Sequence, residues 1–262
     1  MNLSSPLHFW KYQGTGNDFI LVDNRDLHFQ KSDTDLVAKL CDRRFGIGAD
    51  GLILLENDET SDFRMVYYNS DGNESSMCGN GGRCIVAFAH ELGIIGEETR
   101  FKAIDCIHEA KIVNGKVELK MVDVQEVRDL EKYYFLNTGS PHHVQEVKEL
   151  DELELKRTGA KIRYGLYGEK GSNVNFVEQV SDATFKVRTY ERGVEDETLS
   201  CGTGVTAVAI AMHHAGRTVE NEVLTQAPGG DLVIRFESSE NSYRNIWLIG
   251  TATKVFEGQW KQ

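Results

Sequence analysis

The chain has 262 residues, enough for two small domains or one large one. Its 29 basic and 41 acidic residues give a formal net charge of −12, which argues against a nucleic-acid binder, because such proteins cluster Lys and Arg to neutralise phosphates. No apolar run approaches the roughly 18 residues that a membrane span requires, and residues 1–8 have neither the basic nor the apolar region of a secretory signal, so we expect a cytoplasmic protein.

The first half of the chain predicts a helix, a strand and a second helix, in that order. The first helix is expected over about residues 33–42, after a variant of the capping box that starts at Ser32. β-Branched and aromatic residues predict a strand over residues 63–68. Apolar side chains at i, i+3, i+4 and i+7 from Ile85 predict the second helix, and Gly93 stands where a left-handed C-terminal residue is wanted.

The second half predicts the same order of elements. A helix is expected over about residues 150–157 and a strand over residues 184–190. The spacing of apolar residues from Val205 predicts another helix, which Gly216 follows in the same way. Further strands are expected over residues 117–121, 232–236 and 246–248.

A repeat relates the two halves. Cys78–Cys84 (CGNGGRC) and Cys201–Ala207 (CGTGVTA) stand 123 residues apart, and each precedes one of the two apolar helices. At the same offset, a His and a Gly recur at the ends of these helices, so chance is the weaker interpretation. We therefore expect an α+β protein of two similar halves, residues 1–125 and 126–262, each a sheet wrapped around one central helix, with the C-terminal strand contributing to the first half.

A cysteine at the start of a helix has a distinct chemistry. The positive end of the helix dipole and the unpaired backbone N–H groups lower a thiol pKa into a range of ~3.5–7.5. The glycines that follow Cys78 and Cys201 let backbone amides approach a carboxylate or a phosphate. The Lys-[Ser/Thr] of a phosphate loop is missing from both copies, which argues against a nucleotide site.

Two such cysteines predict a site that inverts a carbon stereocentre. One thiolate would remove the α-proton from one face while the other thiol delivers a proton to the opposite face, and the helix N-termini would hold the carboxylate. Other roles remain open. Cys41 and Cys84 are treated as small core residues. A zinc site drawn from Cys78, Cys84, His90 or His213 lacks the usual spacing, and a redox pair of Cys78 with Cys201 has no Cys-x-x-Cys motif.

The motifs around both cysteines resemble those of the diaminopimelate epimerases, which interconvert LL- and meso-diaminopimelate without a cofactor. Supporting motifs follow in the family's order over most of the chain, at Gly14–Phe19, Arg44–Gly51, Tyr68–Gly72, Pro141–His142, Asn173–Phe176 and Tyr190–Gly193. The resemblance implies two pseudo-symmetric halves, each a β-barrel-like sheet around a central helix. It also implies a cytoplasmic homodimer that acts on a small molecule, with no cofactor, no metal and neither nucleic acid nor membrane as partner.

The resemblance also implies a role for individual residues. Cys78 and Cys201 would be the catalytic acid and base. His142 and Glu191 would adjust the pKa values of the two thiols, and Arg192 would clamp the distal carboxylate. The substrate-binding residues would be Asn17, Asn69, Gly79, Asn80, Asn173, Glu191, Arg192, Gly202 and Thr203. Two positions depart from the family pattern: Gly51 stands where many members have Gln, and Ser140 where Asn is common.

Related activities define the alternatives. A proline or hydroxyproline racemase of the same fold would also use two thiols, but its secondary amine substrate would not need the Glu191–Arg192 pair. An isomerase of the phenazine-biosynthesis type would lack the paired cysteines. A non-enzymatic amino-acid binding module would leave both thiols without a purpose, and a pyridoxal enzyme would need a Schiff-base lysine that neither glycine motif supplies.

Overall fold

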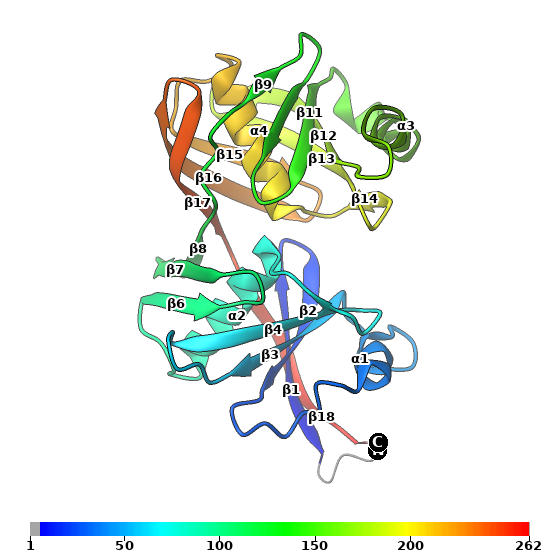
Figure 1. The fold of residues 1–262 in the computed structure, drawn as a ribbon, viewed down its shortest axis with the longest axis vertical. Helices are drawn as coiled ribbons and strands as arrows, with labels where there is room; N and C mark the ends of the chain where they lie inside the picture. The colour runs from blue at the N-terminus through cyan, green and yellow to red at the C-terminus, as the bar shows by residue number, and fades with distance from the viewer. Residues whose placement is uncertain (1–5, 262) are drawn as a thin grey trace. The chain divides into compact units, whose positions relative to one another are not determined.

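The chain divides into two compact units, seen in a computed structural model that describes residues 6–261 (Figure 1). The first unit takes the residues up to Leu119 together with those from Thr251 onward, and the second takes Lys120–Gly250. Residues 1–5, at the start of the segment in which we expect no secretory signal, lie outside the described residues. The boundary expected between the two halves, residues 1–125 with the Cys78 motif and residues 126–262 with the Cys201 motif, stays a prediction.

The first unit contains a mixed sheet. Its strands pair in an order that begins with the C-terminal strand and then follows the chain: β18 (Thr253–Trp260), β1 (Leu7–Gly14), β2 (Asn17–Asp23), β3 (Gly51–Glu56), β4 (Phe63–Asn69), β6 (Glu98–Lys102), β7 (Ile107–Val113) and β8 (Lys116–Lys120). The β2–β3 and β4–β6 pairs are parallel and the others antiparallel. A short strand, β5 (Glu74–Ser75), pairs with β4.

The second unit repeats this pattern of pairing. Its strands follow the chain as β9 (Arg128–Asp129), β10 (Tyr134–Asn137), β11 (Pro141–Glu146), β12 (Asn173–Ser181), β13 (Thr184–Glu191), β15 (Glu222–Ala227), β16 (Gly230–Ser239) and β17 (Ser242–Gly250). The β11–β12 and β13–β15 pairs are the parallel ones. The short β14 (Asp196–Thr198) pairs with β13 as β5 pairs with β4.

The helices occupy equivalent places in the two units. Helix α1 (Thr34–Cys41) connects β2 to β3, and α3 (Leu155–Tyr167) connects β11 to β12. Helix α2 (Gly79–Glu91) lies between β5 and β6 in the chain, and α4 (Gly202–His214) lies between β14 and β15. The prediction of two similar α/β halves, made from the repeat, is therefore confirmed.

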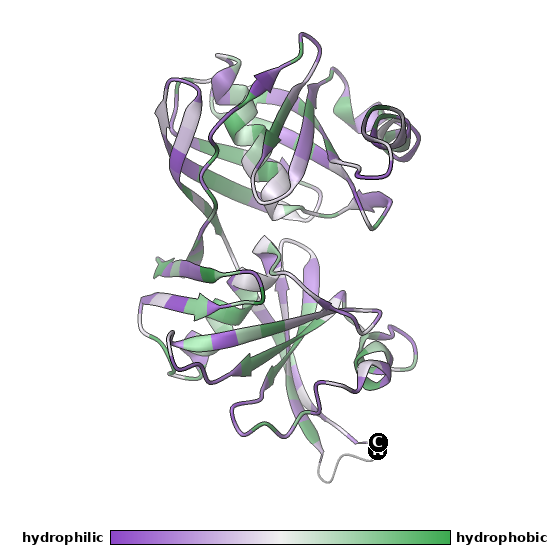
Figure 2. Ribbon diagram, viewed as in Figure 1, coloured by the Kyte–Doolittle hydropathy of each residue, from purple (hydrophilic) through white to green (hydrophobic). Residues whose placement is uncertain are grey.

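The two central helices, α2 and α4, are buried by the strands around them. Helix α2 contacts β1, β2 and β3, and α4 contacts strands from β10 to β17. Every residue of α4 from Gly204 to Met212 is buried, and Figure 2 shows most of this helix in hydrophobic colours. Gly93 and Gly216 follow the two helices with φ of 69° and 67°, the left-handed conformation expected there.

Two other helices differ from the sequence-based predictions. Helix α1 is capped by Asp33, whose carboxylate accepts a hydrogen bond from the Leu36 N–H at 3.0 Å, so the expected cap at Ser32 is wrong. The helix expected over residues 150–157 is a 3₁₀ turn at Leu150–Glu152 followed by α3, which begins at Leu155. The two are separate because the backbone of Leu153 is extended, with φ of −67° and ψ of 125°.

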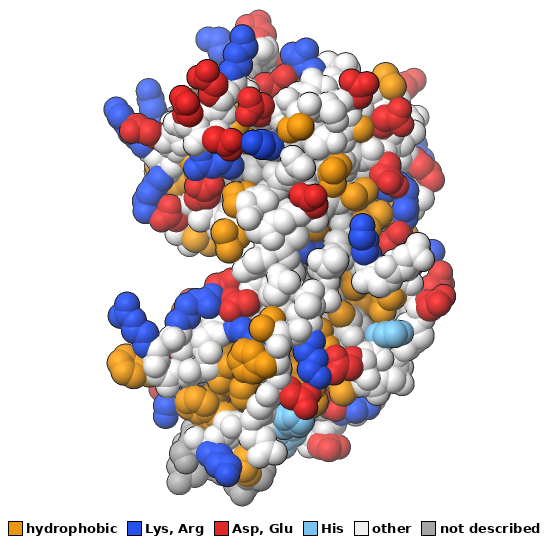
Figure 3. Space-filling view, turned by 180° about the vertical axis from the view of Figure 1, so that it is seen from behind, with side chains coloured by type: hydrophobic (Ala, Val, Ile, Leu, Met, Phe, Trp, Pro, Cys, Tyr) orange, Lys and Arg blue, Asp and Glu red, His pale blue; other side chains and the backbone are white. Residues whose placement is uncertain are grey.

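Charged side chains of both signs are interspersed on the surface. On the face shown in Figure 3, Lys and Arg side chains lie among Asp and Glu side chains. An example of the pairs they form is Lys186 with Asp151, at 2.9 Å. Exposed pairs of this kind contribute about 0–1 kcal/mol each, so burial of α2 and α4 is the larger stabilising contribution. Within residues 6–261, no helix is both long and apolar enough to cross a membrane.

Candidate active site

Cys78 is the N-cap residue of α2. Its backbone is extended, with φ of −101° and ψ of 149°, and its Sγ accepts a hydrogen bond from the Gly81 N–H at 3.2 Å. A Cβ added at Gly81 would lie 3.2 Å from this sulfur, so the glycine leaves room for the contact. The donor and the positive end of the helix would both stabilise a thiolate at this position.

Two of the expected substrate-binding residues meet beside the start of α2. The Asn80 side chain, which is buried, donates to Asn17 Oδ1 at 3.2 Å. Asn17 in turn donates to the carboxylate of Asp50, and Thr15 Oγ1 donates to Asn80 Oδ1 at 3.3 Å. These contacts fix the β1–β2 turn against the first turn of the helix. Gly79 opens that turn, where helix geometry leaves N–H groups without partners inside the helix.

Arg83 is a residue of this region to which the sequence analysis gave no role. It belongs to α2, its side chain is 0% exposed, and its guanidinium donates to Gly79 O at 3.2 Å, Thr15 Oγ1 at 3.0 Å and Asn80 Oδ1 at 3.1 Å. The sequence did contain a signal, because Arg83 is a cation in a helix with an otherwise apolar face.

Cys201 is the N-cap residue of α4, the position equivalent to Cys78. Its backbone is extended, with φ of −123° and ψ of 110°, and its carbonyl accepts the first helical hydrogen bond from the Val205 N–H at 2.9 Å. Its Sγ lies 3.5 Å from Thr203 Oγ1. The Thr203 carbonyl accepts from Thr138 Oγ1 at 2.8 Å, which ties the β10–β11 turn to this helix. Gly202 opens the first turn, as Gly79 does in α2.

His142 lies fully buried in a network of amide side chains. Its Nδ1 accepts from Asn175 Nδ2 at 3.1 Å, while its Nε2 lies 3.4 Å from Asn173 Nδ2. Burial, and to a smaller extent the charge of Arg192, lowers the pKa of His142 to about 3. The imidazole is therefore neutral near pH 7, so it can act on a neighbouring group only through its dipole and hydrogen bonds.

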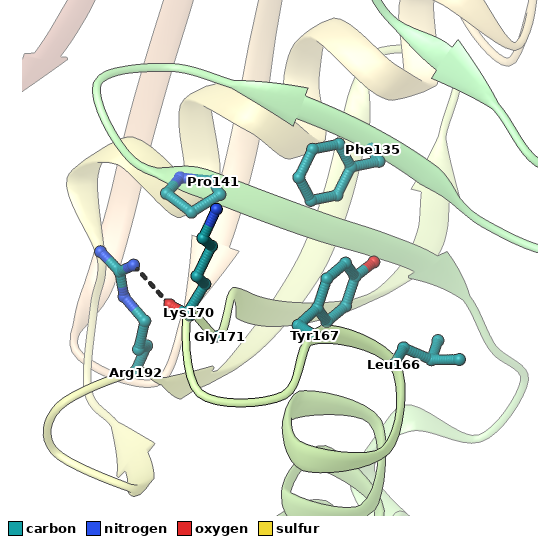
Figure 4. Close-up of a pocket in the computed structure, with 7 residues that line it drawn as sticks. All are labelled: Phe135, Pro141, Leu166, Tyr167, Lys170, Gly171 and Arg192. Atoms are coloured by element: carbon teal, nitrogen blue, oxygen red, sulfur yellow. Dashed lines mark hydrogen bonds between the residues drawn. The ribbon is translucent and has the colours of Figure 1, made fainter.

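Arg192 and Glu191 lie at the end of β13, beside the same network. The backbone N–H of Arg192 donates to Asn173 Oδ1 at 2.8 Å, and its guanidinium donates to Lys170 O at 2.9 Å (Figure 4). Glu191 accepts from Thr198 Oγ1 at 2.9 Å. The structure therefore brings together Arg192, Asn173 and His142, which the sequence analysis took from separate motifs.

A pocket of about 530 Å³ opens beside Arg192. Arg192 and Lys170 line one end, and the aromatic rings of Phe135 and Tyr167 line the other, as the close-up in Figure 4 shows. Pro141, directly before His142, lies beside the side-chain nitrogen of Lys170. Two cations and an apolar wall suit a carboxylate that is carried on an aliphatic chain.

Three other positions from the sequence analysis have different surroundings. Asn69 ends β4 in an exposed turn, where its backbone carbonyl accepts from the Gly72 N–H at 3.0 Å. At Gly51 an added Cβ would lie 2.5 Å from Tyr68 O, so no side chain fits there. Ser140 Oγ accepts from Asn173 Nδ2 at 3.0 Å, which joins Ser140 to the His142 network.

The remaining cysteines lie apart from the helix starts. Cys41 and Cys84 are buried, and burial raises the pKa of the Cys41 thiol to about 12 and that of Cys84 further, so both are neutral near pH 7. Cys106, with Asp105 and His108, forms the one group among the described residues whose side chains could hold a metal ion. These three already contact one another, with Cys106 Sγ 3.5 Å from His108 Nε2.

Solved structures of other proteins have the same fold. The PhzF-family phenazine biosynthesis protein of Bacillus anthracis matches with a TM-score of 0.79 at 16% identity, covering 97% of this chain and 99% of its own. A hydroxyproline epimerase of Agrobacterium vitis matches with a TM-score of 0.70 at 14% identity, covering 100% and 94%. The chain therefore has the two-domain mixed α/β fold of these proteins, in which each domain is a sheet around a central helix.

Sequence comparison identifies the family. The model of the diaminopimelate epimerase family matches residues 9–127 and 134–255. The diaminopimelate epimerase of Flavobacterium psychrophilum is 58% identical over 253 residues, which cover 96% of this chain and 99% of the relative. That of Aquifex aeolicus is 40% identical and covers 97% of each chain. The chain belongs to the diaminopimelate epimerase family, whose members are isomerases.

Proposed function

We propose that the protein interconverts LL- and meso-diaminopimelate in the cytoplasm with two thiols and no cofactor. The observation that carries this proposal is the equivalence of Cys78 and Cys201, each the N-cap residue of a buried central helix in its own unit. A high identity to relatives named diaminopimelate epimerase supports the choice of substrate.

The chemistry is a proton exchange at the α-carbon. The thiolate of one cysteine takes the α-proton, and the thiol of the other gives its proton to the opposite face, which inverts the configuration. The electron pair of the broken C–H bond is stabilised by the α-carboxylate, which accepts hydrogen bonds from the N–H groups of Gly79, Asn80 and Gly202 and from Thr203. After one turnover the two cysteines have exchanged their protonation states.

The distal end of the substrate has its own receptor in this proposal. Arg192 binds the distal carboxylate with its planar guanidinium, and Glu191 accepts hydrogen bonds from the distal ammonium. The amide groups of Asn17, Asn69 and Asn173 complete the polar contacts. His142, which is neutral, and Glu191 adjust the proton affinity of the thiols.

The deciding experiment follows the reaction in D₂O. Purified protein, dialysed and given no cofactor, is incubated with LL-diaminopimelate. The expected result is meso-diaminopimelate that carries deuterium at the inverted α-carbon. Absence of the meso product from a folded wild-type protein would refute the proposal.

The same assay, run with proline, tests the alternative activity. A proline or hydroxyproline racemase has the same fold, but it has no use for a receptor at the distal end of the substrate. We expect proline to remain unchanged under conditions that convert diaminopimelate. Faster conversion of proline would favour the alternative.

We also propose that the protein is a homodimer, as the family resemblance implies. Light scattering at micromolar concentration is expected to give a mass near twice the 29.5 kDa of the chain. A mass of one chain at catalytically active concentrations would contradict this part of the proposal.

A further inference from the structure

Arg83 is a buried cation without a carboxylate partner. Its hydrogen bonds go to a carbonyl, a hydroxyl and an amide oxygen, all of them neutral. Its Nε is buried without any hydrogen-bond partner. Burial lowers its pKa only to about 10, so the guanidinium stays charged near pH 7. A buried charge is costly unless an opposite charge lies nearby, so Arg83 requires an anion close to its guanidinium.

The carboxylates of β2, β3 and α2 are already paired with other cations. On β2, Asp18 pairs with Lys11 of β1 at 2.8 Å. Glu56 of β3 pairs with Lys31 at 3.0 Å, and Glu91 of α2 itself pairs with Lys254 at 2.7 Å. Burial raises the pKa of Tyr12 on β1, so its phenol is neutral, and β4 and β8 present Met65 and Leu119 to the glycines of α2.

Cys84 and Cys78 are the ionisable groups that would raise the pKa of Arg83 if they carried a negative charge. Cys84 is fully buried and its thiol stays protonated, as described above. Cys78 caps the helix one turn away from Arg83 and accepts the hydrogen bond from Gly81. Because the guanidinium donates to the carbonyl of Gly79, directly after Cys78, it is held against the same helical turn.

The equivalent position in the second unit has no charge. At the 123-residue offset of the repeat, Arg83 corresponds to Thr206. The Thr206 hydroxyl donates to the Gly202 carbonyl at 2.8 Å, the same bond that Arg83 makes to Gly79, so the two side chains share a structural role but differ in charge. His142, which reaches the start of α4 through Asn175, is neutral, and the side chain of Arg192 beside it is exposed and screened by water.

We propose that Arg83 is a positioning residue that holds Cys78 as the thiolate in the empty enzyme, while Cys201 rests as the thiol. This inference rests on the proposed two-thiol function and adds to it the protonation state from which a turnover starts. The substrate isomer that presents its α-proton to Cys78 reacts with the resting enzyme directly. The other isomer requires the proton of Cys201 to pass first, through solvent, to Cys78.

The test measures each thiol separately and needs no substrate. Wild-type protein is treated briefly with iodoacetamide over a range of pH, and tandem mass spectrometry gives the alkylation rate of Cys78 and of Cys201. We expect the midpoint of the rate–pH curve for Cys78 to lie below that for Cys201. In Arg83→Met, the midpoint for Cys78 should rise by at least ~1 pH unit, the lower bound for loss of a nearby opposite charge, while that for Cys201 stays fixed.

Two further variants separate charge from structure. Arg83→Lys retains the charge without the planar fork, so its midpoint for Cys78 should lie close to that of wild type. It can be measured even if Arg83→Met does not fold. Thr206→Val removes the matched hydrogen bond in the second unit without any change in charge, and the midpoint for Cys78 should not move. A wild-type midpoint for Cys201 below that for Cys78, or an unchanged Cys78 midpoint in folded Arg83→Met, overturns the inference. Because no substrate is present, these outcomes are independent of whether wild-type protein converts diaminopimelate.

Discussion

At the scale of single residues, each reactive sulfur depends on the helical turn that follows it. Gly81 gives Cys78 its hydrogen-bond donor, and Thr203 lies against the sulfur of Cys201. The two sulfurs are therefore fixed by separate groups, one in each unit. If catalysis needs a base on one face and an acid on the other, neither group can substitute for the other.

Replacing either cysteine tests this requirement. Cys78→Ala and Cys201→Ala should each lower kcat at least ~10²-fold, the low end for loss of a general acid or base. The exposed Cys106 provides a matched control, since Cys106→Ala should leave the rate of meso-diaminopimelate formation unchanged. Near-wild-type turnover by either of the first two variants would rule out the two-thiol mechanism.

Replacing Arg192 tests the proposed choice of substrate. Arg192→Lys keeps the positive charge but loses the planar fork that binds a carboxylate through two hydrogen bonds. We expect kcat/KM for LL-diaminopimelate to fall by the equivalent of about 1.5–3 kcal/mol, the range for hydrogen bonds to charged groups. Arg157→Lys, at an exposed ion pair on α3, is the control and should change little. Unchanged kcat/KM in Arg192→Lys would assign the distal carboxylate to another residue.

At the scale of elements, both central helices begin with glycines that a strand or loop approaches closely. The contact is tightest at Gly204, where an added Cβ would lie 2.5 Å from Asn175 Oδ1. Asn175 is also the donor to His142 Nδ1. A side chain at position 204 would therefore disturb the His142 network as well as the helix.

Gly204→Ala should destabilise the fold by about 1–3 kcal/mol, the usual cost of overpacking a core, and should lower activity at temperatures where the variant is folded. Gly165→Ala in α3 is the control, because nothing lies within 4 Å of its added Cβ and Ala favours a helix over Gly by roughly 0.5–1 kcal/mol. Urea unfolding of the two variants measures both effects. If Gly204→Ala were as stable as wild type, Asn175 would have to be able to move aside at no cost.

The elements were predictable where a periodic pattern or a repeat specified them. The spacing from Ile85 and Val205 predicted α2 and α4, and the strand at residues 63–68 appears as β4. The predicted boundaries of α1 and α3 were less accurate. The start of α1 depends on which side chain accepts from the first free N–H groups, and the start of α3 depends on the extended backbone at Leu153.

The candidate site was predictable to the extent that its residues lie in recognisable motifs. The two cysteines and their glycines follow from the repeat itself. The joining of Arg192, Asn173 and His142 depends on the parallel pairing of β11 with β12, in which His142 lies opposite Asn173. Asn175, two residues further along β12, belongs to a motif but received no role, because its donation to His142 depends on tertiary structure.

At the scale of the whole molecule, buried neutral histidines make stability depend on pH. Burial lowers the pKa of His143 to about 4, in addition to the value of about 3 for His142. In the unfolded chain a histidine titrates near ~6.5, so between these values the unfolded chain binds protons that the folded chain does not. The contribution of these two histidines to the free energy of unfolding is therefore fully present above about pH 6.5. It falls as the pH is lowered toward their pKa values in the folded protein.

Lowering the pH from 7 to 5 should reduce the free energy of unfolding by about 2 kcal/mol for each of these histidines, by proton linkage. Carboxylates contribute little in this window, because their unfolded pKa values lie near ~4. Urea unfolding at both pH values measures the loss, which should be smaller in His142→Gln and unchanged in a variant of an exposed histidine, His28→Gln. The same loss in His142→Gln as in wild type would mean that His142 is protonated in the folded protein.

The pairing of β1 with β18 has a consequence for how the chain is made. Leu7 lies opposite Trp260 in this pair, so one edge of β1 has no partner strand until the residues of β18 have been synthesised. The second unit ends at Gly250 and can be completed earlier. At 5–20 residues per second, synthesis of the roughly 130 residues of the second unit takes about 7–26 s. For that time β1 presents an open edge, the kind that pairs with other nascent chains, so the first unit is protected from aggregation only after the second unit has been synthesised.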